Sequence, residues 1–138
     1  MKKYRKTYIS LKCHGEATAK GRPRLGKYGV YTPNKTKIYE NWVKICFQNE
    51  YPSFEPLETP VCLLITVWKK IPKSVSQKKK QKMLLGEILP TTKPDVDNIA
   101  KSICDALNGF AYKDDSQVCS LVIQKLYAEE DKVIVHFK

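Results

Sequence analysis

The order of apolar and polar positions along the chain predicts both strands and helices. Strands are indicated where β-branched and aromatic residues cluster or alternate with polar ones, and helices where apolar residues recur three and four positions apart. A stretch rich in Gly, Lys, Arg and Pro, from Gly15 to Lys37, predicts a loop or a loose hairpin around Gly29 to Tyr31. In chain order, we expect a strand over residues 8–13, a helix over 35–49, a strand over 60–69, a short helix after Ser74 or Ser76, a helix over 98–108, and strands over 117–127 and 132–137.

Capping residues indicate where the later helices begin and end. Ser74 or Ser76 is expected to cap a short lysine-rich helix, and Asp97 or Asn98 to cap the helix that follows the Pro-containing segment 89–94. Gly109 supplies a left-handed stop after that helix.

This order of elements predicts the fold class. We expect an α+β or mixed α/β fold, a single domain over residues 1–138 with a small mixed sheet and flanking helices. The polar turn Glu129-Glu130-Asp131 separates the last two strands, so they are expected to form a C-terminal β-hairpin.

Composition narrows the class of protein. Apolar residues make up 42% of the 138 residues, enough for a folded core. The longest apolar run, Val61 to Trp68, is shorter than a membrane span, and the basic start of the chain lacks the apolar region of a signal peptide. The five cysteines are odd in number and widely spaced, which favours buried free thiols in a reducing cytoplasm over disulfides or a zinc site.

Charge is divided unevenly along the chain. Residues 1–94 carry 20 Lys or Arg against 6 Asp or Glu, whereas residues 95–138 carry 5 against 8, and the total is +11. A basic body attracts the phosphates of nucleic acid, and an acidic segment attracts divalent metal. A solvated basic surface kept for solubility is the alternative interpretation.

The acidic segment contains the densest set of candidate chemical groups. Asp95 and Asp97 are two residues apart, so in an extended segment entering a helix both carboxylates could face one metal ion. Lys101 and Asp105 follow at helical spacing on one face. The pair Asp114-Asp115 comes after a short loop, and we expect it to fold back onto the start of the helix. Carboxylates that meet there would repel one another unless a cation such as Mg²⁺ joined them.

Simpler interpretations exist for each of these groups. Asp97, Lys101 and Asp105 could form only a surface ion-pair ladder, and Asp114-Asp115 could be only turn residues. A calcium loop is excluded, because Ala100 and Ala106 stand where that loop requires Gly and Glu.

Four segments together carry a resemblance to a known family. KPDVDNIAKSICDALNG over residues 93–109 is followed by YKDDSQV over 112–118, and the N-terminal half contains KGRPR over 20–24 and YTPNKTKIYE over 31–40. In this combination and order the chain resembles the RusA family of Holliday-junction resolvases.

The resemblance implies a function and a set of site residues. Members of this family are small homodimeric endonucleases of DNA recombination and repair, frequent in phages and prophages. They use Mg²⁺ (Mn²⁺ is an alternative) to make paired nicks in opposed strands of a four-way DNA junction. By resemblance the metal-binding residues are Asp95, Asp97 and Asp115, with Lys101 as a catalytic lysine and Asp114 and Asp105 as accessory acids.

The basic motifs acquire a DNA-binding role from this resemblance. Their side chains suit phosphate contacts, which position DNA without reading its sequence. Tyr28, Tyr31 and Tyr39 could stack on bases, although we expect them to pack in the core. The expected DNA-binding residues are Arg22, Arg24, Lys35, Lys37 and Lys93.

Two other function classes compete with the nuclease. A non-catalytic nucleic-acid-binding protein with a structural acidic cluster would share the charge pattern. A metal-dependent nucleotidyl or glycosyl transferase could use an Asp-x-Asp pair, but we expect it to carry a Gly-rich nucleotide-binding loop, and the glycines here are scattered.

Overall fold

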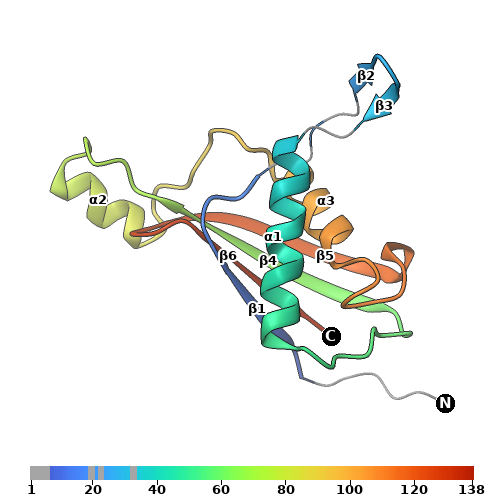
Figure 1. Ribbon diagram of the computed structural model, residues 1–138. Helices are drawn as coiled ribbons and strands as arrows, with labels where there is room; N and C mark the ends of the chain where they lie inside the picture. The colour runs from blue at the N-terminus through green and yellow to red at the C-terminus, as the bar shows by residue number, and fades with distance from the viewer. Residues whose placement is uncertain (1–6, 19–20, 22–23, 32–33) are drawn as a thin grey trace.

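The computed structural model describes residues 7–18, 21, 24–31 and 34–138. It contains one four-stranded mixed sheet, one separate two-stranded hairpin and three α-helices (Figure 1). The elements in chain order are β1 (Ile9–His14), β2 (Arg24–Gly26), β3 (Gly29–Tyr31), α1 (Asn34–Glu50), β4 (Val61–Lys70), α2 (Gln77–Leu84), α3 (Val96–Leu107), the 3₁₀ helix η1 (Asp115–Gln117), β5 (Val118–Ala128) and β6 (Lys132–Phe137).

The sheet is built around β4. Its strand order is β1-β6-β4-β5, with β6 antiparallel to both of its neighbours and β5 parallel to β4. The apolar run of β4 explains its central place, because alternate residues such as Val61, Leu63 and Ile65 are buried. The mixed α+β fold expected from the sequence is therefore confirmed.

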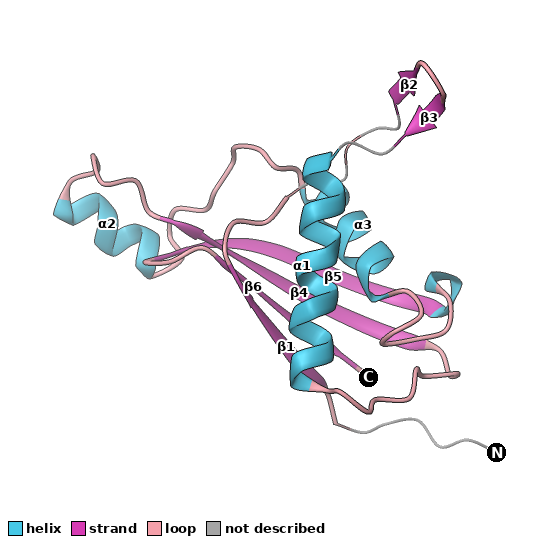
Figure 2. Cartoon of the chain, viewed as in Figure 1, coloured by secondary structure: helices cyan, strands magenta, loops and turns pink. Residues whose placement is uncertain are grey.

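Helices α1 and α3 cover one face of this sheet and pack against each other (Figure 2). The core lies between the two layers. Val43 and Phe47 of α1, Ile99 and Ile103 of α3 and the inward side chains of the strands are all buried. The apolar face of α3 is thus the face that packs on the sheet. Among the described residues, no helix has both the length and the apolar character to cross a membrane.

The C-terminal strands are present, joined by a short polar turn as expected, but they do not pair with each other. Strand β4 lies between β5 and β6. The turn crosses the end of β4, where the Lys70 amide donates a 2.9 Å hydrogen bond to Asp131 Oδ1 and the Ile71 amide donates a 3.0 Å bond to the Ala128 carbonyl. Strands β5 and β6 do not pair directly, because the apolar β4 is better buried between two strands than at the edge of the sheet.

The start of α3 also differs from the expectation. The helix begins at Val96 with Asp95 as its N-cap, one or two residues before the predicted caps Asp97 and Asn98. Asp95 has extended backbone angles, φ −72° and ψ 145°, and its carbonyl accepts a 3.1 Å hydrogen bond from the Ile99 amide. The helix therefore starts as soon as Pro94 has been passed. Ser76 is the N-cap of α2, in agreement with one of the two expected caps.

The hairpin β2–β3 projects away from the body of the protein (Figure 1). Tyr28 at its turn is 94% exposed, so the prediction that this side chain packs in the core is wrong. Tyr39 is buried, as expected. The side chain of Tyr31 lies outside the described residues. The five cysteines are free; Cys13 is buried, but Cys119 on β5 is exposed, contrary to the expectation of buried thiols.

Candidate active site

Two of the predicted metal ligands lie at the beginning of α3. Asp95 is the N-cap and Asp97 lies in the first turn, and both side chains are exposed. In an extended segment, Asp95 and Asp97 would project in the same direction. The segment is already helical at Val96, so the two side chains project in different directions.

A groove opens beside this helix start. It has a volume of about 370 Å³ and is formed by the segment after β1, the first turn of α1 and the start of α3. It brings together two carboxylates, two ammonium groups and two neutral polar side chains. The lining residues are Glu16, Ala17, Thr18, Lys35, Lys93, Pro94, Asp95 and Asn98.

Part of this groove is formed by residues that no sequence motif indicates. Glu16 belongs to no motif that was singled out, because it lies in a segment expected to be a loop far from the acidic cluster. It lines the groove together with Asp95 only because the segment after β1 lies beside the start of α3. Asn98 could have been found, since it follows Asp97 directly and lies one turn after Asp95 on the groove side.

The exposed face of α3 continues away from the groove. Asp97, Lys101 and Asp105 follow one another at four-residue intervals; Asp97 and Lys101 are exposed and Asp105 is half-buried. The ammonium of Lys101 therefore projects on the solvent side of α3, one turn after Asp97. The prediction that Asp97, Lys101 and Asp105 share one face of a helix is therefore confirmed.

The second acidic pair divides into two roles. Asp114 is the N-cap of η1: its Oδ2 accepts a 3.1 Å hydrogen bond from the Ser116 amide and a further bond from the Ser116 hydroxyl. These bonds hold the pKa of Asp114 below its ordinary value. Gln117 completes the capping box by accepting from the Asp114 amide at 2.9 Å. Asp114 therefore organises the turn, and the neighbouring Asp115 is left exposed.

Gln117 also ties this turn to the rest of the fold. Its Nε2 donates to the carbonyls of Leu57 and Thr59 at 2.7 and 2.9 Å. The Asp-Asp-x-Gln motif thus has a structural explanation, in which the first and last residues fix the turn and the second, Asp115, is presented to solvent.

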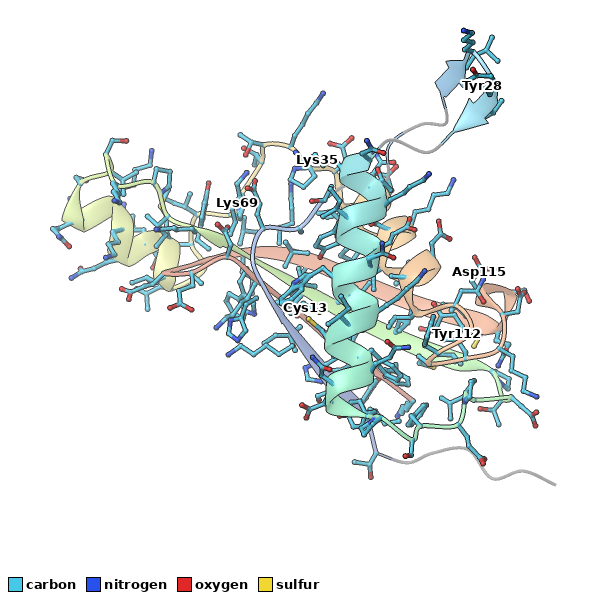
Figure 3. All side chains as sticks on the ribbon, in the orientation of Figure 1. Cys13, Tyr28, Lys35, Lys69, Tyr112 and Asp115 are labelled. Atoms are coloured by element: carbon cyan, nitrogen blue, oxygen red, sulfur yellow. The ribbon has the colours of Figure 1, made fainter. Side chains whose placement is uncertain are left out.

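Asp115 lies near the second half of α3. Burial raises the pKa of Tyr112 well above its ordinary value, and the charges of Asp115 and Asp105 raise it further. The same two carboxylates contribute to the raised pKa of Cys104, after burial. Asp105 and Asp115 are therefore close to the buried Tyr112 and to the half-buried Cys104. Figure 3 shows Asp115 beside the loop that carries Tyr112, whereas Lys35 lies at the beginning of α1.

The carboxylates have the chemistry that Mg²⁺ prefers, since it is a hard ion with oxygen ligands. Asp95, Asp97 and Asp115 are exposed, and within the described part of the chain none of them forms an ion pair. The described residues do not, however, include a group of three or more His, Cys, Asp or Glu placed to hold one metal ion. The donor atoms thus fit the metal, while their convergence around one ion is not seen.

The expected DNA-binding residues are distributed unevenly. Lys35 and Lys93 line the groove, and Lys37 is exposed on the first turn of α1 outside it. Arg24 lies in β2, with a side chain outside the described residues, and Arg22 falls outside them altogether.

Comparison with known proteins agrees with these features. The family model described as "Endodeoxyribonuclease RusA" matches residues 14–138, which include the groove, α3 and the Asp-Asp-x-Gln turn. A Bacillus subtilis (strain 168) protein with the name "Uncharacterized protein YqaN" is 43% identical over 134 residues, covering 92% of this chain and 93% of that protein. The chain therefore belongs to the RusA family of endodeoxyribonucleases.

Proposed function

We propose that the protein resolves four-way DNA junctions by paired, divalent-metal-dependent hydrolysis of phosphodiester bonds. Membership of the RusA family supports endodeoxyribonuclease activity. The observation that carries the proposal is the groove, where the Asp95 carboxylate lies together with the ammonium groups of Lys35 and Lys93. Carboxylates attract a cation and ammonium groups attract phosphate, so a groove that holds both suits a phosphodiester bound with a divalent metal ion.

Each group has a distinct task in this proposal. Asp95, Asp97 and Asp115 are the proposed ligands of Mg²⁺ or Mn²⁺, which supplies charge neutralisation and activation of water when bound. Lys35 and Lys93 bind the DNA backbone at the groove, and Lys101 stabilises negative charge as the bond is cut.

The basic body of the protein accounts for attraction to DNA over a longer range. Arg22, Arg24 and Lys37 are proposed to contact phosphates outside the groove. Paired nicks require two identical sites, so the proposed working form is a homodimer. The Bacillus subtilis relative is consistent with a protein of the bacterial cytoplasm, encoded by a bacterium, phage or prophage.

Cleavage of labelled DNA tests this function directly. Purified protein is incubated with a four-way junction and with a linear duplex of the same arm sequence, each with Mg²⁺ and with EDTA. We expect symmetrical nicks in the junction only with Mg²⁺, and little cutting of the duplex. Junction binding without cleavage in either condition would instead support the non-catalytic nucleic-acid-binding protein. Equal cutting of the duplex would contradict junction selectivity but not nuclease activity.

A further inference from the structure

The segment that leads into Asp95 is held by two lysines of the sheet. Lys69 Nζ of β4 donates to Thr92 Oγ1 and to the Lys93 carbonyl, both at 2.8 Å. Lys125 Nζ of β5 donates to the Thr92 carbonyl at 2.7 Å and to the Pro94 carbonyl at 3.1 Å. Four hydrogen bonds from two ammonium groups thus converge on three successive residues.

The register of the parallel strands explains why both lysines reach the same segment. Lys125 lies opposite Val67 in the β4–β5 ladder, and Lys69 follows Val67 by two residues. Alternate residues of a strand share a face, so Lys69 and Lys125 both project on the face where Val67 is buried. Both lysines also border a small pocket with Glu16 and Pro94, two residues that line the groove as well.

The residues that accept these hydrogen bonds belong to the segment that carries the charged groups of the groove. Lys93 and Asp95 line the groove, and Pro94 lies between them. Segment 89–95 belongs to no helix or strand, so regular secondary structure does not fix its backbone. An ammonium has three donors and no acceptor, and its hydrogen bonds to carbonyls are stronger than those between neutral groups. These contacts therefore hold the backbone that leads directly into Asp95 and α3.

We propose that Lys69 and Lys125 are positioning residues of the active site, which clamp Thr92–Pro94 so that Asp95 and Lys93 face the groove. They act through this backbone and touch neither the metal nor the DNA. The inference rests on the proposed function, because it assigns the two lysines a role in the geometry of that same site.

Substitution by Met tests the clamp, because Met keeps an unbranched, flexible side chain but cannot donate these hydrogen bonds. Lys69→Met and Lys125→Met should each lower the affinity of the DNA-free protein for Mn²⁺, measured by electron paramagnetic resonance or calorimetry. Loss of groups that orient metal ligands typically costs about 10–100-fold in metal affinity or activity. Single-turnover cleavage of the junction at saturating protein should fall by a similar factor, with little change in the Kd for DNA.

Lys70→Met is the matched control. Lys70 neighbours Lys69 on β4 and is exposed, and its hydrogen bond to Asp131 uses the backbone amide, which the substitution preserves. The conservative variants Lys69→Arg and Lys125→Arg keep a cationic donor and should recover Mn²⁺ affinity more than the Met variants. A general loss of stability would instead lower the melting temperature of Met and Arg variants alike.

The outcomes separate the clamp from the function. Met variants with the Mn²⁺ affinity and cleavage rate of Lys70→Met would overturn the clamp while leaving the nuclease intact. A wild-type protein that binds Mn²⁺ but cuts no junction would contradict the proposed function, and the Mn²⁺ affinities of the variants would still decide the clamp. A wild-type protein that binds no Mn²⁺ would overturn both.

Discussion

The hydroxyl of Tyr112 donates a 2.7 Å hydrogen bond to the carbonyl of Cys104, and so joins the loop after α3 to the helix itself. Tyr112 is fully buried. The loop that it anchors leads directly to Asp114 and Asp115. The position of the second acidic pair thus depends on a tyrosine that has no chemical role of its own.

Tyr112→Phe should lower the free energy of unfolding by about 1 kcal/mol, because it removes this hydrogen bond and little packing. It should also change the dependence on pH. Burial raises the pKa of Tyr112 in the folded state, so its stabilising contribution is complete below the ordinary tyrosine pKa of about 10 and is lost as the pH rises above it. Urea unfolding followed by circular dichroism at pH 8 and pH 10.5 measures both effects.

The exposed Tyr28 provides the control for that experiment. Tyr28→Phe should leave the unfolding free energy unchanged at both pH values, because its side chain is 94% exposed. The wild type should lose more stability than Tyr112→Phe between pH 8 and pH 10.5. An equal loss in the two proteins would show that Tyr112 does not ionise on unfolding as proposed.

Asp114→Ala and Asp115→Asn should affect different properties, although the residues are adjacent. Asp114→Ala removes the cap of η1 and should lower the urea midpoint. Asp115→Asn should abolish cleavage and leave the midpoint unchanged. Since hydrogen bonds hold the pKa of Asp114 below its ordinary value, its stabilising effect should be lost as the pH falls, which unfolding at pH 3 and pH 7 would reveal.

Loss of cleavage in a stable Asp114→Ala protein, together with full activity in Asp115→Asn, would reverse these two assignments. That result would place Asp114 in the chemistry and make Asp115 a residue of the turn.

The sequence predicted the elements better than their connections. Amphipathic spacing predicted where α1 and α3 lie along the chain, since side-chain periodicity is a local property. It did not predict the buried face of α1, where Ile38, Trp42 and Ile45 are exposed. The insertion of β4 between β5 and β6 depends on which strand best fills the centre of the sheet, and no turn signal records that choice. The same limit applies to Tyr28, whose exposure follows from a hairpin that projects from the body.

The candidate site shows a similar division. Motifs identified Asp95, Asp97 and Lys101, and α3 places Lys101 one turn after Asp97 as the spacing predicts. The expected common direction of Asp95 and Asp97 is not found, because the helix already begins at Val96. Glu16 and the lysines of the clamp could not be found in this way, because they meet segment 92–95 only through tertiary structure. A residue that acts by holding a backbone carbonyl leaves no motif, since many side chains can carry an ammonium to that place.

The proposed paired nicks predict a homodimer. The chain has a mass of 15.9 kDa and carries one copy of the acidic motif, so two opposed cuts require two chains. Analytical ultracentrifugation at micromolar concentration should give twice the chain mass, with and without DNA. A monomer in both conditions would contradict the dimer, whereas a dimer only with DNA would mean that the junction assembles it.

Asp95→Asn and Asp97→Asn should each abolish cleavage and leave junction binding intact or tighter. Each substitution removes a proposed metal ligand and one negative charge, while the basic body that attracts DNA is unchanged. Asn is as good an N-cap as Asp, so Asp95→Asn should keep the stability of the wild type. Gel-shift titration in EDTA measures binding, and cleavage in Mg²⁺ measures activity. A variant that cuts at the wild-type rate would remove its residue from the proposed metal site.

Lys101→Ala separates a role in the chemistry from a role in attracting DNA. Lys101 lies one helical turn after Asp97 on the exposed face of α3, so its ammonium can lie beside a metal ion bound there. If Lys101 stabilises the transition state, its loss should lower the cleavage rate by about 10²–10³-fold, as for other preorganised electrostatic groups. If Lys101 only contacts phosphate, its loss should weaken DNA binding. The slope of the logarithm of the binding constant against the logarithm of the salt concentration should then become smaller by about one unit. Single-turnover cleavage at saturating protein removes the effect of affinity, and we expect the rate to fall there. An unchanged rate at saturation, with weaker binding, would assign Lys101 to the DNA-attracting surface.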